Sequence, residues 1–261
     1  MSDIIIDLSD GVLRVQLNRP EKKNALTASM YTELANIFAG ADRNDDVRVV
    51  LWHGAGDSFC AGNDVKDFLT NPPAGHDSPQ SRLTNAFLGF SKPIVVAVQG
   101  FAVGGGTTML THCDFVYASG SARFQLPFIN LGLSPEFGSS FSVPARAGHL
   151  RASELFLLGD PFTAAHAVEV GIVTRIVPDA ELLATANATA QKLAAKPAGA
   201  LRASKRLLRR AVQAQLHEAV KGEQQEFGER VRSEEAKEAF SAFLEKRPPN
   251  FNKKATPVAG E

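Results

Sequence analysis

The 261-residue sequence has few cysteines and no excess of charge of either sign. Its two cysteines, Cys60 and Cys113, are too few for a disulfide framework and form no CxxC pair, so we expect a reducing, cytoplasmic compartment. The 28 Lys and Arg residues balance 28 Asp and Glu residues. Proteins that bind nucleic acid or anionic membranes normally carry a basic excess, so neither kind of partner is expected.

Long apolar runs and metal-binding spacings are also missing. No run reaches the roughly 20 apolar residues that span a bilayer, and residues 1–7 lack the pattern of a secretory signal. The six histidines form neither HxxxH nor HExxH, so no metal site is predicted. The G-x-S-x-G elbow of a serine hydrolase is absent too.

Apolar residues make up 44% of the chain, enough for a large core. The aromatic residues are 17 Phe against 2 Tyr and 1 Trp, which favours a dry apolar cavity, although a Phe-rich core would give the same composition. Short β-branched runs that alternate with helical patterns predict an α/β fold. The predicted strands cover residues 12–17, 47–52, 94–98, 115–117 and 172–177.

The helical pattern changes along the chain. Thr27 is predicted to cap a helix that ends at Gly40. Residues 179–246 are rich in helix-forming residues and predict three helices joined by short breaks. We therefore expect an α/β core over residues 1–195 and a helical region over residues 196–261.

Two glycine-containing turns follow predicted strands. FCAGND occupies residues 59–64, and QGFAVGGG occupies residues 99–106. Small residues at a strand exit let a ligand approach backbone N–H groups. The second turn matches neither the dinucleotide nor the P-loop motif. One N–H group from each turn would form an oxyanion hole, and an ordinary glycine turn is the alternative for each.

A third segment, LGLSPEFGSS at residues 131–140, carries Glu136 among apolar neighbours. In one interpretation Ser134 caps a helix, Pro135 is its first residue and Glu136 merely complements the helix dipole. In the other, an apolar pocket raises the pKa of Glu136 toward the range of a general base. The phenylalanines predicted to surround that carboxyl group are Phe128, Phe137 and Phe141.

Four collinear segments resemble the enoyl-CoA hydratase/isomerase, or crotonase, superfamily. They are residues 18–26 (NRPEKKNAL), 59–64, 100–106, and 243–247 with Phe251. The resemblance spans nearly the whole chain. It implies a crotonase-like spiral of ββα units with a C-terminal helical trimerisation region, assembled as a homotrimer or a dimer of trimers.

The resemblance also implies a ligand and its contacts. The N–H groups of Asn63 and Gly105 would hold the thioester oxygen of an acyl-CoA substrate. Coenzyme A would enter as part of that substrate, and no separate cofactor is expected. Predicted substrate or CoA contacts are Lys22, Lys23, Ala25, Ala61, Gly62, Asp64, Phe128, Phe137, Phe227 and Lys246.

The two positions at which family hydratases carry catalytic glutamates are here Thr108 and Phe128. Neither side chain replaces a carboxylate, so standard hydration is not favoured. The remaining Glu136 resembles the base of single-glutamate Δ3,Δ2-enoyl-CoA isomerases, which implies a role in fatty-acid metabolism that shifts a double bond from 3-enoyl-CoA to 2-enoyl-CoA. The alternatives are a hydratase or another reaction of the family, and a catalytically silent acyl-CoA-binding protein.

Overall fold

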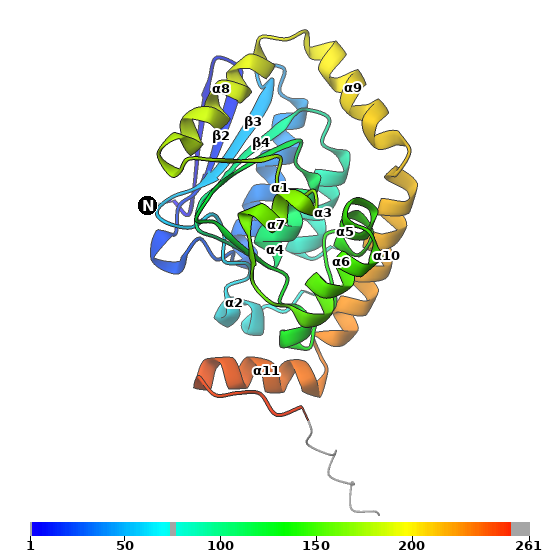
Figure 1. Ribbon diagram of the computed structural model, residues 1–261. Coiled ribbons are helices and arrows are strands. Elements are labelled where there is room, and N and C mark those ends of the chain that lie inside the picture. The colour runs from blue at the N-terminus through cyan, green and yellow to red at the C-terminus, as the bar shows by residue number, and fades with distance from the viewer. Residues whose placement is uncertain (1, 74–76, 252–261) are drawn as a thin grey trace, which may run out of the picture.

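Buried strands rich in β-branched residues form the centre of the molecule. The computed structural model describes residues 2–73 and 77–251. Six strands make one sheet in the order β1-β2-β3-β4-β6-β9, in which β1 runs antiparallel to β2 and the other pairs are parallel (Figure 1). These strands are β1 (Ile4–Ser9), β2 (Val12–Leu17), β3 (Val49–Gly54), β4 (Ile94–Val98), β6 (Phe115–Ser119) and β9 (Arg175–Val177).

A second, smaller layer of strands lies beside the first. Its sheet has the order β5-β7-β8, from β5 (Phe101–Val103), β7 (Arg123–Gln125) and β8 (Phe162–Thr163). Two isolated parallel bridges extend this layer: Leu26 pairs with Asn63, and Cys60 pairs with Ala102 of β5. The chain therefore alternates a strand of the large sheet with a short segment of the second layer, and this winding is the spiral of the crotonase fold that the resemblance implied.

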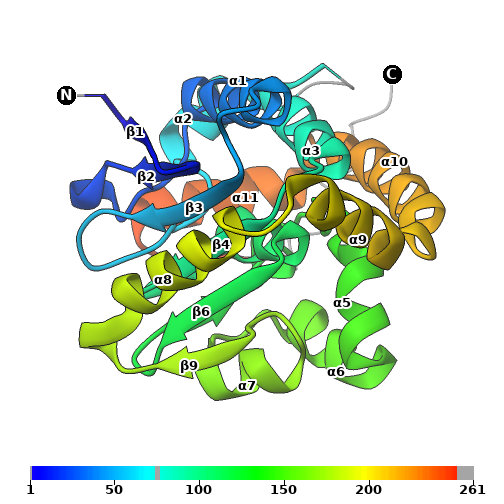
Figure 2. The same cartoon turned by 90° about the horizontal axis from the view of Figure 1, so that it is seen from above.

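The central strands of the large sheet, β2, β3, β4 and β6, are buried on both faces because their side chains alternate between two apolar clusters. Val49 and Leu51 share one cluster with apolar residues of α8 (Leu182–Ala194). Val50 and Trp52 belong to the larger core, to which α1 (Ala28–Arg43) and α3 (Pro79–Gly89) also contribute. Figure 2 shows α8 and the α1–α3 pair on opposite sides of β3.

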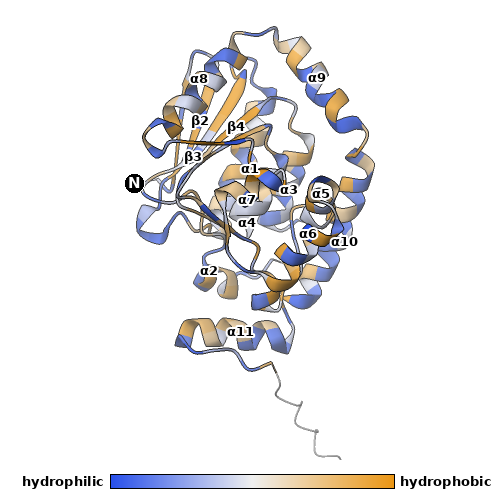
Figure 3. Cartoon of the chain, in the orientation of Figure 1, coloured by the Kyte–Doolittle hydropathy of each residue, from blue (hydrophilic) through white to orange (hydrophobic). Residues whose placement is uncertain are grey.

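Three further helices follow α8 and form the outer wall. They are α9 (Ala198–Arg210), α10 (Gln213–Arg230) and α11 (Glu234–Glu245). In Figure 1, α9 and α10 run along one side of the molecule and α11 lies across its base. Orange and blue alternate along α9 in Figure 3, and its Leu208 is 82% exposed. Within the described residues, no helix is both long and apolar enough to cross a bilayer.

The remaining helical segments are short. They lie in the connections between strands and carry much of the site described below. They are η1 (Pro20–Lys22), α2 (Val65–Thr70), α4 (Gly105–Thr108), η2 (Met109–His112), η3 (Ile129–Leu131), α5 (Ser139–Ala147), α6 (His149–Ser153), the π-helical turn η4 (Glu154–Leu158), α7 (Ala164–Glu169) and η5 (Asp179–Glu181).

Several predicted boundaries were wrong. The helix capped by Thr27 does not stop at Gly40 but continues to Arg43, because Gly40 keeps a negative φ and the buried Ala41 extends the apolar face. Residues 179–246 hold four α-helices rather than three. The strand predicted over residues 172–177 is confined to its last three residues.

The capping interpretation of Ser134 was also wrong. The helix in this region is α5, which begins at Ser139 with Gly138 as its N-cap. Phe137 and Gly138 both have left-handed backbone angles, with φ of 59° and 69°. A helix starting at Pro135 would require right-handed angles at those positions, so Glu136 lies in an irregular segment before the helix.

Candidate active site

A cleft of about 390 Å³ opens between the glycine-containing turns and the C-terminal helices. Its walls are mostly apolar, and Glu136 is the one carboxylate among the described residues that line it. The wall residues from the spiral are Ala61, Gly62, Asn63, Val65, Phe68, Val103, Gly104, Gly105, Gln125, Pro127, Phe128, Asn130, Leu131, Leu133 and Glu136, and those from the C-terminal helices and beyond are Phe227, Ala239, Phe240, Phe243, Arg247 and Pro249.

The first turn presents the backbone of Asn63 to the cleft. Leu26 donates its N–H to Gly62 O at 2.8 Å, and Asp64 donates its N–H to Leu26 O at 2.8 Å. These two bonds do not use the N–H of Asn63, which donates to no described residue. Gly62 has φ of 84°, and a Cβ there would lie 2.7 Å from Val103 O, so only glycine lets the first turn lie this close to the second.

The second turn presents Gly105, the first residue of α4. The N–H of Gly104 is used in a hydrogen bond to Gln125 O at 3.0 Å, whereas that of Gly105 donates to no described residue. A Cβ on Gly105 would lie 3.1 Å from Oε1 of Glu136 and 3.0 Å from the hydroxyl of Tyr31. The glycine therefore lets the second turn lie directly beside the carboxyl group.

Glu136 is buried, with 8% of the residue exposed, and its Oε1 has no hydrogen-bond partner among the described residues. Burial, with the negative charge of Glu223 as the second cause, raises the pKa of Glu136 to about 8. A carboxyl group with a pKa near neutrality exchanges protons efficiently as a general base and then as an acid. This is the property that the apolar neighbours predicted from sequence.

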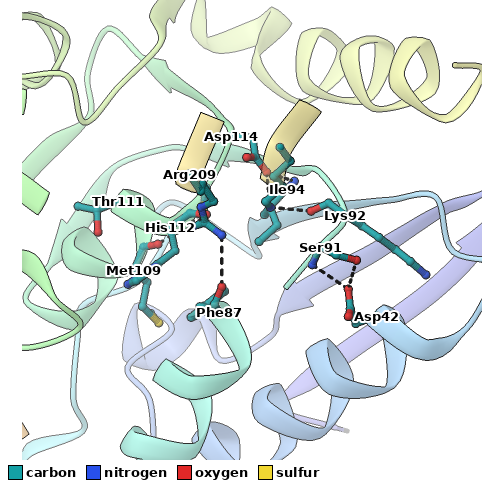
Figure 4. Close-up of polar contacts among 12 residues, drawn as sticks. Asp42, Phe87, Ser91, Lys92, Ile94, Met109, Thr111, His112, Asp114 and Arg209 are labelled. Carbon is teal, nitrogen blue, oxygen red and sulfur yellow. Dashed lines mark hydrogen bonds and ion pairs between the residues drawn. The ribbon is translucent and has the colours of Figure 1, made fainter. Parts of the chain in front are cut away.

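The segment that carries Glu136 is held from two sides. Glu223 of α10 accepts from Gly138 N at 2.5 Å and from Ser140 N at 2.7 Å. On the other side, Nε2 of His112 in η2 lies 2.6 Å from the backbone oxygen of Phe137. The carbonyl of His112 in turn accepts from Arg209 at 3.1 Å, and Figure 4 shows the Arg209 side chain beside Phe87 and His112.

The structure brings together part of the predicted site. Glu136, Asn63, Gly105, Ala61, Gly62, Phe128 and Phe227 all line the cleft. Phe137 instead lines a neighbouring cavity of about 50 Å³ and stacks on Tyr31, with ring centroids 6.5 Å apart. The predicted roles of these residues in binding and catalysis stay predictions.

Other predicted contacts lie outside the cleft walls. Asp64 caps α2 and pairs with Arg19 at 3.1 Å. The Lys23 ammonium lies 4.4 Å from the centre of the Phe101 ring. Lys22 and Lys246 occur at the ends of η1 and α11, and Ala25 follows η1. A role for these residues with CoA stays a prediction.

Sequence reasoning missed Tyr31 and Glu223. Tyr31 is fully buried, and its hydroxyl has no hydrogen-bond partner in the described part of the chain. Burial, followed by the nearby Glu136 and Cys60, raises the pKa of Tyr31. Both residues come from helices remote in sequence from Glu136. Glu223 is one of four glutamates on α10, and Tyr31 occupies an apolar position of α1, so neither carried a local signal for this site.

Nothing in the described chain gathers three or more His, Cys, Asp or Glu side chains in an arrangement able to hold a metal ion. At the two hydratase positions, Thr108 is buried with its hydroxyl directed to Gly104 O at 3.3 Å, and Phe128 is buried in the cleft wall. The cleft wall has one buried carboxyl group, and it also contains Asn63 and Gly105, whose backbone N–H groups donate to no described residue. Such a site suits proton transfer at a carbon next to a carbonyl whose oxygen gains negative charge.

A spiral fold with this kind of site is the architecture of enzymes and binding proteins of the crotonase superfamily. The chain belongs to the enoyl-CoA hydratase/isomerase family, whose sequence model matches residues 7–254.

Two curated relatives and one solved structure illustrate the similarity. The chain is 33% identical over 251 residues to human enoyl-CoA delta isomerase 2, matching 94% of this chain but only 64% of that protein's length. It is 34% identical over 261 residues to 1,2-epoxyphenylacetyl-CoA isomerase of Escherichia coli K12, covering 97% of this chain and all of the relative. A crystal structure of an enoyl-CoA hydratase/isomerase from Pseudoalteromonas atlantica is 39% identical with a TM-score of 0.90, covering 96% of this chain and all of the other.

Proposed function

We propose that this protein is an acyl-CoA isomerase that shifts a double bond from C3 to C2 of an enoyl-CoA thioester. One observation carries the proposal: the sole carboxyl group among the described residues of the cleft wall is buried, unpartnered at Oε1 and adjacent to Gly105. A 1,3-shift of one proton needs one base that also returns the proton. The names of the two curated relatives, both isomerases of CoA esters, support the same reaction class.

In the proposed reaction, ionised Glu136 removes a proton from C2 of the 3-enoyl chain. The electrons of that C–H bond enter a dienolate, and the negative charge on the thioester oxygen is stabilised by the N–H groups of Asn63 and Gly105. Protonated Glu136 then returns the proton to C4, which leaves the double bond between C2 and C3. The apolar cleft wall, with Phe128 in place of a second carboxylate, keeps water from adding to the product.

The test compares wild type with Glu136→Gln, using 3-hexenoyl-CoA and following formation of the conjugated 2-enoyl thioester by its absorbance. We expect a loss of at least about 100-fold in kcat for the variant. The exposed Glu226 of α10 supplies the control variant Glu226→Gln, which should keep wild-type rates. Equal rates in Glu136→Gln would refute the assignment.

Two further measurements separate the alternatives. Hydration of crotonyl-CoA at a rate comparable to isomerisation would favour a hydratase. Binding of an acyl-CoA in calorimetry without turnover of any enoyl-CoA would favour a silent binding protein.

We also propose that the chain assembles as a homotrimer or a dimer of trimers. Support comes from apolar side chains left exposed on η4 and α9: Leu157 is 67% exposed, Leu207 is 62% exposed and Leu208 is 82% exposed. Large exposed apolar side chains are typical of interfaces. Light scattering after size-exclusion chromatography tests this, and a monomeric mass of 27.9 kDa would refute it.

A further inference from the structure

We propose that Glu223 of α10 is a positioning residue for Glu136: its carboxylate fixes the backbone that follows Glu136 and places a second buried negative charge beside the same carboxyl group. This inference rests on the proposed function, in which Glu136 is the base. Nothing in the sequence pattern around Glu223 connects it with Glu136, which lies 87 positions earlier in the chain.

The first part of the argument is backbone geometry. Phe137, a bulky residue, has φ of 59°, and Gly138 follows with φ of 69°. A left-handed angle at a phenylalanine is disfavoured and persists only when surrounding contacts impose it. The Glu223 carboxylate supplies such contacts, because it accepts from Gly138 N at 2.5 Å and Ser140 N at 2.7 Å. These bonds also satisfy N–H groups at the start of α5.

The opposite side of the segment is held by His112. Burial and the charge of Arg209 lower the pKa of His112 to about 3, so its imidazole is neutral. Its Nε2 must then carry the proton that is donated to Phe137 O at 2.6 Å. The backbone that follows Glu136 is thus clamped between α10 and η2, and this clamp determines where the Glu136 carboxyl group lies.

The second part of the argument is charge. Glu136 and Glu223 both line the cavity of about 50 Å³ that adjoins the cleft, and no Lys or Arg occurs among its described lining residues. Two buried carboxyl groups that line one small cavity disfavour ionisation of each other. The titratable or charged groups near Glu136 are Tyr31 from α1, Cys60 from the first turn and Glu223 from α10. His112 from η2 contacts the next residue through Phe137 O, and Arg247 lies on the cleft wall.

Two variants of Glu223 separate position from charge. Glu223→Gln removes the charge and, because its amide has only one acceptor oxygen, keeps only one of the two bonds from Gly138 N and Ser140 N. The loss of charge should move the acidic limb of the pH profile of kcat/KM for 3-hexenoyl-CoA down by about one pH unit, and the lost bond should lower kcat. Glu223→Asp keeps the charge but shortens the reach to Gly138 and Ser140. It should lower kcat about tenfold or more while the acidic limb stays in place.

The matched control is Glu226→Gln, an equal change of charge at an exposed position of the same helix. This control should change neither the acidic limb of the pH profile nor kcat. A Glu223→Gln variant with wild-type kcat and an unmoved limb would overturn the proposal, as would a Glu223→Asp variant with wild-type kcat.

A measurement on the wild-type protein covers the case in which a variant does not fold. Carbon-13 NMR of labelled glutamate carboxyl groups should show Glu136 and Glu223 titrating as a coupled pair in two steps. Independent titration of the two groups would overturn the proposal. This readout needs no turnover, so a wild-type protein that titrates as a coupled pair but does not isomerise 3-hexenoyl-CoA would refute only the proposed function.

Discussion

Replacing Glu136 with Gln should stabilise the protein, and the gain should grow with pH. The side chain is buried, and its pKa is raised from 4.5 to about 8 by burial and by Glu223. Below pH 4.5 the carboxyl group is protonated in both the folded and the unfolded chain, so ionisation costs nothing. Between pH 4.5 and 8 the unfolded chain ionises while the folded chain keeps its proton, so the free energy of unfolding falls as pH rises.

The size of this effect follows from the interval between the two pKa values. At about 1.4 kcal/mol for each pH unit, the charge of Glu136 costs the folded state about 3 kcal/mol at pH 7 and about 5 kcal/mol above pH 8. Glutamine is nearly isosteric and does not titrate. The difference in unfolding free energy between Glu136→Gln and wild type should therefore increase by several kcal/mol between pH 5 and pH 9.

Urea unfolding at fixed protein concentration measures this difference. Trp52, the only tryptophan of the chain, is fully buried and reports unfolding through its fluorescence. Glu226→Gln controls for the general loss of one negative charge. A stability difference between Glu136→Gln and wild type that is the same at pH 5 and pH 9 would refute the reasoning, because it would mean that Glu136 ionises as easily in the folded state as in the unfolded chain.

Three other substitutions test the packing around the site and behind it. Gly105→Ala places a methyl group 3.1 Å from Glu136 Oε1 and should displace that carboxyl group and lower kcat for 3-hexenoyl-CoA about 100-fold; an unchanged rate would contradict the requirement for this close approach of Gly105 to Glu136. Gly62→Ala forces alanine to φ of 84° and should lower Tm by about 5 °C or more in a calorimetric scan. Lys205→Met breaks the partly buried ion pair with Asp114, whose Nζ–Oδ2 distance is 2.7 Å, and should cost about 1–3 kcal/mol in urea unfolding; a neutral result would show that the ion pair does not stabilise the fold.

Local sequence signals predicted much of the fold because they act within a few residues. The strand over residues 94–98 is confirmed at both ends, since a continuous apolar run bracketed by Pro93 and Gly100 leaves little choice. The Thr27 cap is confirmed by its hydrogen bond from Met30 N at 3.3 Å. Short strands such as β8 were missed because two residues are too few to show an alternation of apolar and polar side chains. Their strand geometry comes from the strands with which they pair.

The sequence by itself determined the family, the two glycine-containing turns and Glu136 among apolar neighbours. Each of these depends on residues that are close together in the chain. The tertiary structure decided that Glu136 precedes a helix rather than lying in one, and that Tyr31 and Glu223 lie around its carboxyl group. The physical reason is that burial and charge act through space, so Glu223 of α10 raises the pKa of Glu136, and Glu136 raises that of Tyr31 of α1, although neither helix is near Glu136 in sequence.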